Sequence, residues 1–236
     1  MTHYTRHQLK EDKFTETAAE SLSWMREHGA KVRAVLIIAV IAIIAAVAGW
    51  FYMQQREQQA SLELSKALRT YSTPLREANT PPNPEFETFT SAKERADASR
   101  KQFREVADKF KHTRSGEVAS YLEAVAAISG GDTAAAEPRL KELASSRNKD
   151  LSSLARIKLA ALYRGSNRED QAIAIYKELV DHPTRMVTKG MAQLELASAY
   201  ESKNPAEAQR IYQSMAADNP ASAAAQIAQE RMKGRQ

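Results

Sequence analysis

The sequence contains no cysteine, only eight glycines and few aromatic residues. Without cysteine the protein has no disulfide, thiolate metal site or cysteine nucleophile, although it suits a reducing and an oxidising compartment equally well. The glycines never give the G-x-G-x-x-G or P-loop spacing that cradles a phosphate, and no H-E-x-x-H metal motif is present. We therefore expect no enzyme, no cofactor, and no catalytic, cofactor-binding or metal-ligating residues.

A strong excess of charge of one sign is also missing. The chain has 34 Lys and Arg against 29 Asp and Glu, and the two signs are interspersed, as in "SAKERADASRKQFREVADKFK" at residues 91–111. Such a pattern is typical of a solvated helix face, where each i,i+4 pair contributes about 0.2–0.5 kcal/mol. A mixed surface is not a nucleic-acid footprint, so no nucleic-acid partner is expected.

Alternation of apolar and polar residues at period two, the mark of a half-buried strand, does not occur over any length. Alanine is abundant, and β-branched residues cluster in one segment. Both observations favour an all-α protein.

That segment, "AVLIIAVIAIIAAVAGWFYM" at residues 34–53, is flanked by Arg33 and Arg56 and contains no charge. Twenty helical residues span about 30 Å, the thickness of a hydrocarbon core. A buried soluble helix is the weaker alternative, because the Val, Leu, Ile and Phe residues favour insertion by about 3–6 kcal/mol. A cleaved signal peptide is also disfavoured, since a long charged region precedes the segment and Trp50–Met53 continue it past the "AVA" at 46–48.

The flanking charges predict an orientation for this transmembrane helix. Arg26, Lys31 and Arg33 lie on its amino side, against Arg56 and Lys66 on its carboxyl side. This small bias favours a cytoplasmic amino terminus, a single pass and translocation of the long carboxyl-terminal part.

Residues 1–33 are predicted to form a cytoplasmic amphipathic arm, since Phe14, Ala18, Leu22 and Met25 share one helix face. Its charges are nearly balanced, so contact with the bilayer surface or a membrane partner and simple solvation remain equal alternatives. Two histidines, at positions 3 and 7, lack a third ligand, and a metal site is not expected there.

Residues 54–87 are predicted to be a helical stalk followed by a proline-rich linker. Leu64, Leu68, Tyr71 and Leu75 keep helical spacing. The prolines of "NTPPNPEFE" at 79–87 have no backbone N–H to donate a helical hydrogen bond, and they force the residues before them into extended conformations.

Residues 88–236 show an apolar pattern with a fixed period. Pairs of large residues three positions apart recur at steps of 37, 36 and 36, and a small residue precedes each pair by four positions. Small residues between the pairs recur at the same period, and turn signals separate the segments. The pairs are Phe103/Val106, Leu140/Leu143, Tyr176/Leu179 and Tyr212/Met215; the preceding residues are Ser99, Ala136, Ala172 and Ala208; the intervening residues are Ala119, Ala155 and Ala192; the turns are 129–132, 164–167 and 202–205.

The period has a physical reason. A helical hairpin of about 35 residues cannot bury its apolar stripe alone, so stacked copies bury it against one another. Small residues are needed where two helix backbones approach, and Pro183 and Pro220 end their units because proline stops a helix. The sequence therefore predicts an α-solenoid.

Units such as "LARIKLAALYRGSNREDQAIAIYKELVDHP" at 154–183 resemble tetratricopeptide repeats. The matching positions are Leu159, Ala160, Tyr163, Ala172, Tyr176 and Leu179. The unit departs from that family's pattern at Asn167, where a turn glycine is usual, at an unfilled tryptophan position, and at Pro183, which lies one residue early.

The layout of charged arm, single membrane helix and carboxyl-terminal repeats is similar to the bacterial ancillary SecYEG translocon subunit (YfgM-like) family. The arm segment "TRHQLKEDKF" also looks like the start of related membrane proteins. That resemblance implies an inner-membrane protein with a periplasmic repeat domain that associates with SecYEG and assists handover of secreted proteins to periplasmic chaperones. A scaffold for another envelope complex, and an enzyme subunit or regulator whose catalytic partner lies elsewhere, remain alternatives.

Individual residues do not identify the protein-binding site. His112 and His182 are expected near helix ends, where histidine interacts with the last carbonyls more often than with a metal. Five tyrosines could line a peptide groove, but packing in the repeat core is favoured for them. They are Tyr121, Tyr163, Tyr176, Tyr200 and Tyr212.

Overall fold

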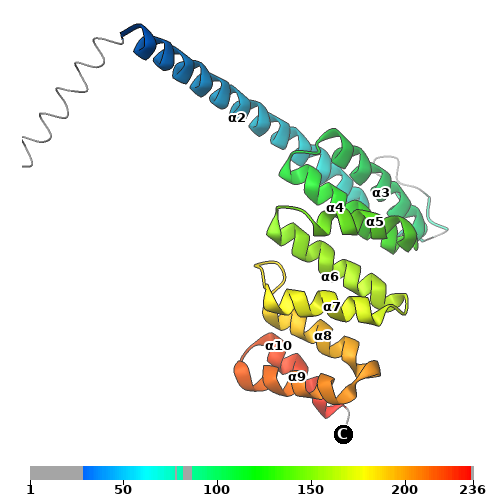
Figure 1. Cartoon of the computed structure of the whole chain (residues 1–236). Helices are drawn as coiled ribbons and strands as arrows, with labels where there is room; N and C mark the ends of the chain where they lie inside the picture. Colours follow the sequence, from blue (N-terminus) through cyan, green and yellow to red (C-terminus); the bar gives the residue numbers. More distant parts are fainter. Residues whose placement is uncertain (1–28, 78, 82–86, 235–236) are drawn as a thin grey trace, which may run out of the picture. The chain divides into compact units, whose positions relative to one another are not determined.

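A computed structural model describes residues 29–77, 79–81 and 87–234 of the chain. Within these residues the regular elements are all α-helices, which confirms the all-α prediction (Figure 1). The amino-terminal amphipathic face, His3, His7 and residues 82–86 of the linker lie outside the described residues. The helices are α2 (Gly29–Ser72), α3 (Ala92–Lys109), α4 (Arg114–Ser129), α5 (Thr133–Ala144), α6 (Lys149–Gly165), α7 (Glu169–Asp181), α8 (Lys189–Lys203), α9 (Pro205–Asp218) and α10 (Ala223–Lys233).

The chain divides into two compact units, Met1–Gln55 and Arg56–Gln236, and α2 contributes to both. In the first unit, α2 is long and apolar enough to cross a membrane, and its most apolar stretch buries nothing against protein. Side chains such as Ile38 and Ile44 are exposed along it. A soluble core helix would bury these groups, so the exposure favours contact with lipid.

In the second unit, the carboxyl-terminal part of α2 serves as the first helix of a hairpin with α3. Ala60, Leu64 and Ala67 are buried in one cluster with Phe103 and other apolar residues of α3 and α4. The Tyr71 ring packs against Phe103 at a centroid distance of 5.9 Å. This part of α2 therefore belongs to the repeat core.

The sequence predicts that the helical spacing continues through Leu75, and this prediction is wrong at Leu75. Helix α2 ends at Ser72, and Leu75 forms an isolated parallel bridge with Phe89. Thr73 precedes Pro74, and the proline ring disfavours helical geometry in the residue before it. The local proline thus overrides the apolar spacing.

The periodic positions predicted from the sequence form the core of the second unit. All eight large residues of the four pairs are buried, and the small residues at positions 99, 136, 172 and 208 are fully buried. Ala119, Ala155 and Ala192 are fully buried as well, and Ala228 of α10 continues their series. The repeat architecture is therefore confirmed.

The turns inside the hairpins also fall where the sequence predicts them. Helix α4 ends at Ser129 and α5 begins at Thr133, capped by the Asp132 side chain, which accepts a hydrogen bond from the Ala135 N–H. In the next turn, Asn167 adopts a left-handed conformation with φ of 55°. Asparagine tolerates this region better than most residues, which explains how it replaces the usual glycine.

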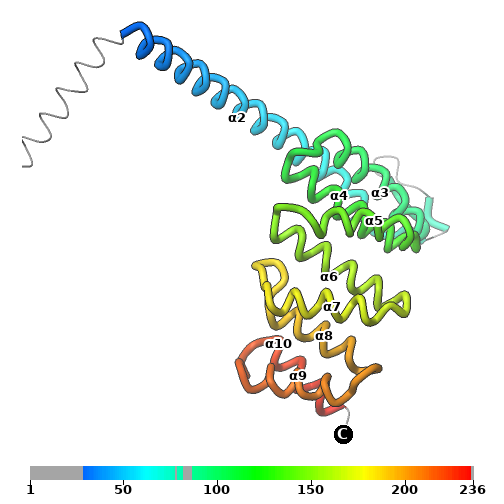
Figure 2. The backbone as a smooth tube through the Cα atoms, in the orientation of Figure 1, coloured from blue at the N-terminus to red at the C-terminus, as the bar shows by residue number. Residues whose placement is uncertain are grey.

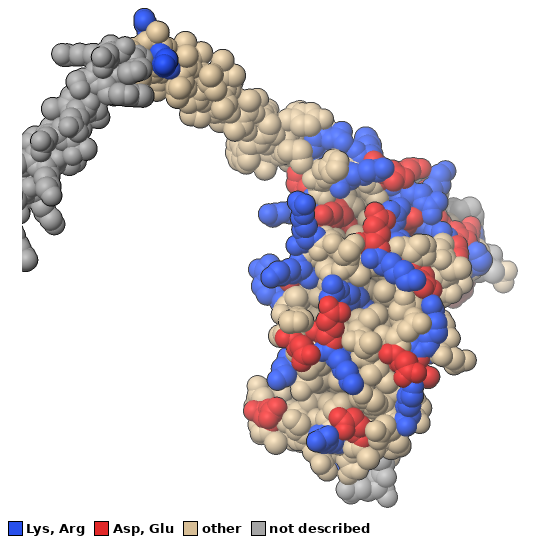
Figure 3. All heavy atoms as spheres, in the orientation of Figure 1, with Lys and Arg blue, Asp and Glu red and all other residues tan. Residues whose placement is uncertain are grey.

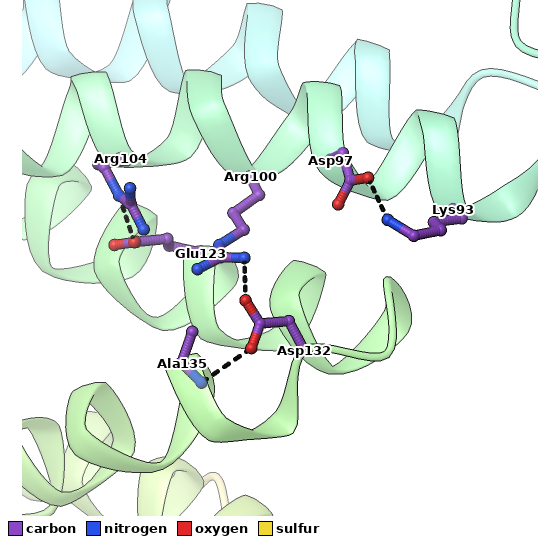
Figure 4. Close-up of polar contacts among 7 residues, drawn as sticks. All are labelled: Lys93, Asp97, Arg100, Arg104, Glu123, Asp132 and Ala135. Atoms are coloured by element: carbon purple, nitrogen blue, oxygen red, sulfur yellow. Dashed lines mark hydrogen bonds and ion pairs between the residues drawn. The ribbon is translucent and has the colours of Figure 1, made fainter.

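Charged pairs connect neighbouring helices (Figure 4). Arg104 of α3 donates to the buried carboxylate of Glu123 in α4 at 2.7 Å, and Arg100 donates to Asp132 at 2.7 Å. Between later hairpins, hydrogen bonds from Arg168 and then Lys141 lower the pKa of Glu137 to about 2. Because the pKa of Glu137 is depressed, this contact stabilises the fold above the ordinary carboxyl range and is lost as the pH falls toward 2.

Candidate protein-binding surface

The helices of the second unit stack in chain order, with each helix packed on the next (Figure 2). First helices of consecutive hairpins also contact one another in two cases, α4 with α6 and α8 with α10. The pair α6 with α8, and the second-helix pairs α5 with α7 and α7 with α9, show no comparable contact in the described chain. When one layer of a stack is closer together than the other, the stack curves toward it. The concave side is therefore formed by the first helices.

Glycine permits one of these approaches, between α8 and α10. A Cβ atom on Gly190 of α8 would lie 2.9 Å from the Cβ of Ala224 in α10. Two small residues at this point let the two first helices pack closely.

An exposed apolar row crosses the first helices. Val118, Met191 and Ile227 are 40%, 45% and 43% exposed, and Leu154 at the equivalent position of α6 is half-buried. Steps of 36, 37 and 36 separate them along the chain, and each directly precedes one of the buried alanines. The alanine faces the neighbouring helix, and the residue before it is turned about 100° away, onto the open side.

A second row lies two helical turns further along the same faces. Val125, Ala161 and Ser198 each follow a member of the first row by seven residues, and each is exposed or half-buried. We call the two rows together the first-helix face: Val118, Val125, Leu154, Ala161, Met191, Ser198 and Ile227.

Charge is sparse within this face. Lys158 and Glu195 lie between the two rows, and Glu195 is 3.4 Å from Arg164 in an ion pair. A repeated, exposed and largely uncharged surface of this kind marks a site for protein contact.

The tyrosines are mostly core residues, as predicted. Tyr163, Tyr176 and Tyr212 are buried, and Tyr212 donates a hydrogen bond to Glu201 at 2.9 Å. Burial raises the pKa of Tyr176, with a further contribution from the nearby Glu195 carboxylate. Tyr121 and Tyr200 are half-buried, and Lys177 lies over the Tyr200 ring at 5.8 Å.

Two equivalent grooves open between consecutive hairpins, with volumes of about 380 Å³ and 530 Å³. Ser120, Glu142 and Ser146 line the first groove, and the residues 36 positions later, Arg156, Glu178 and His182, line the second. His182 ends α7, where its backbone N–H bonds the Glu178 carbonyl, so its predicted place at a helix end is confirmed. His112 lines the first groove just beyond the end of α3.

The described part of the chain holds no group of three or more His, Asp or Glu side chains placed to bind a metal. Many of the charged side chains instead form pairs between helices, and the exposed row at the equivalent position of the first helices is apolar. What this arrangement can do chemically is present a surface to another protein.

These features define the class of the protein as an α-solenoid of helical hairpins. A family model described as a tetratricopeptide repeat-like domain matches residues 22–180, more than half of the chain. The chain therefore belongs to the tetratricopeptide repeat-like domain family, whose members are typically non-catalytic modules for protein interaction. Comparisons with curated proteins and with solved structures found no match.

The family match ends at the end of α7, but the hairpin pattern continues. Helices α8, α9 and α10 repeat the packing of the earlier helices, and their buried residues keep the same period. The 36-residue period could also have located the first-helix face, since Val118, Leu154, Met191 and Ile227 obey it.

Proposed function

We propose that the protein is a membrane-anchored interaction module that binds other proteins through the first-helix face. In its finer form, taken from the resemblance to ancillary translocon subunits, it associates with SecYEG through α2 and helps hand secreted proteins to periplasmic chaperones. Residues 1–33 form a cytoplasmic arm, and 34–53 span a bacterial inner membrane. Residues 54–87 form a stalk and linker whose helical part closes the first hairpin, and 88–236 form the rest of the periplasmic repeat domain.

The observation that carries this proposal is the pair of apolar surfaces that the described residues leave open. One is the stretch of α2 that buries nothing against protein. The other is the first-helix face, where apolar residues stay exposed at the same position of successive hairpins. A membrane accounts for the first surface, and a protein partner accounts for the second.

Photocrosslinking in intact cells tests the partner. A photoreactive residue at Val40 or Phe51 should capture SecY, and one at Met191 on the first-helix face should capture client or chaperone proteins. Ala174, exposed on the second-helix side in α7, is the matched control position and should give few products. A Val118→Glu/Ile227→Glu variant that carries the same photoreactive residue at position 191 should lose the client products without unfolding, because both side chains are exposed.

Capture of a different envelope complex at Val40 and Phe51 would reject the translocon proposal and favour a scaffold. Equal capture from Met191 and Ala174 would reject the first-helix face as the binding surface.

The proposed topology gives a separate expectation. Alkaline phosphatase, which is active only after export, should be active when fused after Gln236, and the same fusion should be inactive when the apolar residues 34–53 are deleted. An inactive fusion on an intact full-length chain would reverse the orientation.

A further inference from the structure

The connections from one hairpin to the next carry charge of only one sign. Residues 110–114, 145–149 and 182–189, which comprise the first three of these connections and the first residue of the following helix, contain six Lys and Arg and no Asp or Glu. The last connection, 219–222, contains no charged residue. The turns inside the hairpins are different, since they contain Asp132 in one and Arg168 in another. We call the six cations the basic edge: Lys111, Arg114, Arg147, Lys149, Arg185 and Lys189.

These cations are exposed and mostly unpaired. Arg185 is 2.9 Å from Asp150 in an ion pair, with its side chain 92% exposed. The other five form no ion pair with any residue that the structure describes. They are free to bind an external anion.

Three of the cations occupy positions that do not help their helices. Arg114, Lys149 and Lys189 are the first residues of α4, α6 and α8. The amino end of a helix already carries partial positive charge, so a cation there is unfavourable. Stability of the repeat does not explain why the same unfavourable placement occurs in three consecutive hairpins.

The chain enters the second unit at this same edge. Arg56 donates to the Lys109 carbonyl, and Glu57 accepts hydrogen bonds from the backbone N–H groups of Arg114 and Ser115. Arg56 follows the end of the apolar segment, Met53, by three residues, which reach at most about 11 Å. The connection at 110–114 is thus bound to residues that follow the apolar segment by only a few positions along the chain.

The later connections lie along the same edge of the second unit. In Figure 1 the helices α6 and α8 both begin on the left side of the stack, and Figure 3 shows Lys and Arg side chains projecting there. The cations are therefore distributed along the edge rather than gathered in one pocket, which suits an extended anionic surface.

We propose that the basic edge binds the anionic phospholipid headgroups of the membrane that anchors α2. Exposed Lys and Arg side chains are attracted to an anionic lipid surface, and the attraction falls off within a Debye length. The anchor keeps the edge at high local concentration, so several weak contacts are sufficient. This inference rests on the proposed membrane anchoring and is independent of the identity of the protein partner.

Site-specific labelling of the full-length chain in nanodiscs tests the inference, because the protein has no cysteine of its own. A fluorescent label is attached at Met186→Cys, in the connection before α8, or at Ser202→Cys, near the other end of α8. The nanodiscs contain phosphatidylcholine alone or an equimolar mixture with phosphatidylglycerol, each doped with a lipid whose headgroup bears a nitroxide quencher.

Quenching at position 186 should exceed that at position 202, should be greater in the anionic nanodiscs, and should decline as salt is added. An R114Q/K149Q/K189Q variant should lose the extra quenching at position 186. The matched K101Q/K158Q/K233Q variant removes three unpaired cations elsewhere and should retain it. Circular dichroism melting of both variants checks that the fold is intact.

Quenching at position 186 that does not respond to lipid charge would overturn the inference and would assign the basic edge to an acidic protein segment instead. If the quenching depends on lipid charge as expected but Val40 and Phe51 give no SecY crosslinks, only the proposed partner is rejected. The two failures are therefore distinguishable.

Discussion

Replacing Tyr176 with alanine is expected to lower the free energy of unfolding by about 3–5 kcal/mol, the cost typical of removing a buried ring. Tyr176 is fully buried at the centre of the largest apolar cluster, which joins residues of α4 to α8. The cavity would open between hairpins, where the backbone cannot collapse without separating the helices. Urea unfolding followed by circular dichroism measures the loss.

Tyr176→Phe is the matched control, because it removes only the hydroxyl. That hydroxyl is buried and makes no hydrogen bond within the described residues, although Glu195 lies near it. Without a hydrogen bond to lose, the phenylalanine variant should differ from the parent by less than about 1 kcal/mol. A large loss in Tyr176→Phe would show that the hydroxyl, and not ring packing, matters here.

Gly116→Ala is expected to destabilise the protein by about 3 kcal/mol, at the upper end of the range for overpacking. A Cβ atom at Gly116 would lie 2.0 Å from the Phe110 carbonyl oxygen and 2.7 Å from its carbon. Both atoms belong to the backbone of the α3–α4 connection, so this connection would have to shift away from α4 to admit one methyl group. Thermal unfolding monitored by circular dichroism measures the effect.

Gly165→Ala provides the control, with the opposite sign expected. Gly165 is the last residue of α6, and a Cβ atom there would meet nothing within 4 Å. Alanine should therefore be neutral or stabilise by up to about 1 kcal/mol through its helix propensity. If Gly116→Ala were equally harmless, the close approach of Phe110 to α4 would be contradicted.

The core of the repeat domain could be predicted from the sequence because it is periodic. When an apolar residue recurs every 36 or 37 positions, the repetition itself indicates that the position is buried in every unit. Phe103, Leu140, Tyr176 and Tyr212 could therefore be assigned to the core without a structure. The turns were predictable for a local reason, since Gly, Asn and Pro mark them directly.

The first hairpin could not be predicted in the same way. Its first helix is the end of α2, and the connection to α3 at residues 73–91 is longer than the turns of the later hairpins, so the period does not extend upstream. Leu75 satisfied the apolar spacing but stands after the proline that ends the helix.

The candidate binding surface was missed because apolar character was equated with burial. Val118 and Met191 stand beside buried alanines and are as apolar as core residues, so only the helix geometry separates the open side from the packed side. Gly116 was missed for a similar reason, since a close approach to the backbone of Phe110 leaves no pattern in a single sequence.

Helix α2 contains both the apolar segment and the first helix of the first hairpin, and this determines where a soluble fragment can begin. A soluble fragment that begins at residue 88 lacks Ala60, Leu64 and Ala67, and it would expose the side of α3 and α4 that these residues cover. Uncovered apolar surface of this kind promotes aggregation. A fragment that begins at Arg56 removes the apolar segment and keeps the first hairpin closed, which makes it the natural form for crystallisation and solution work.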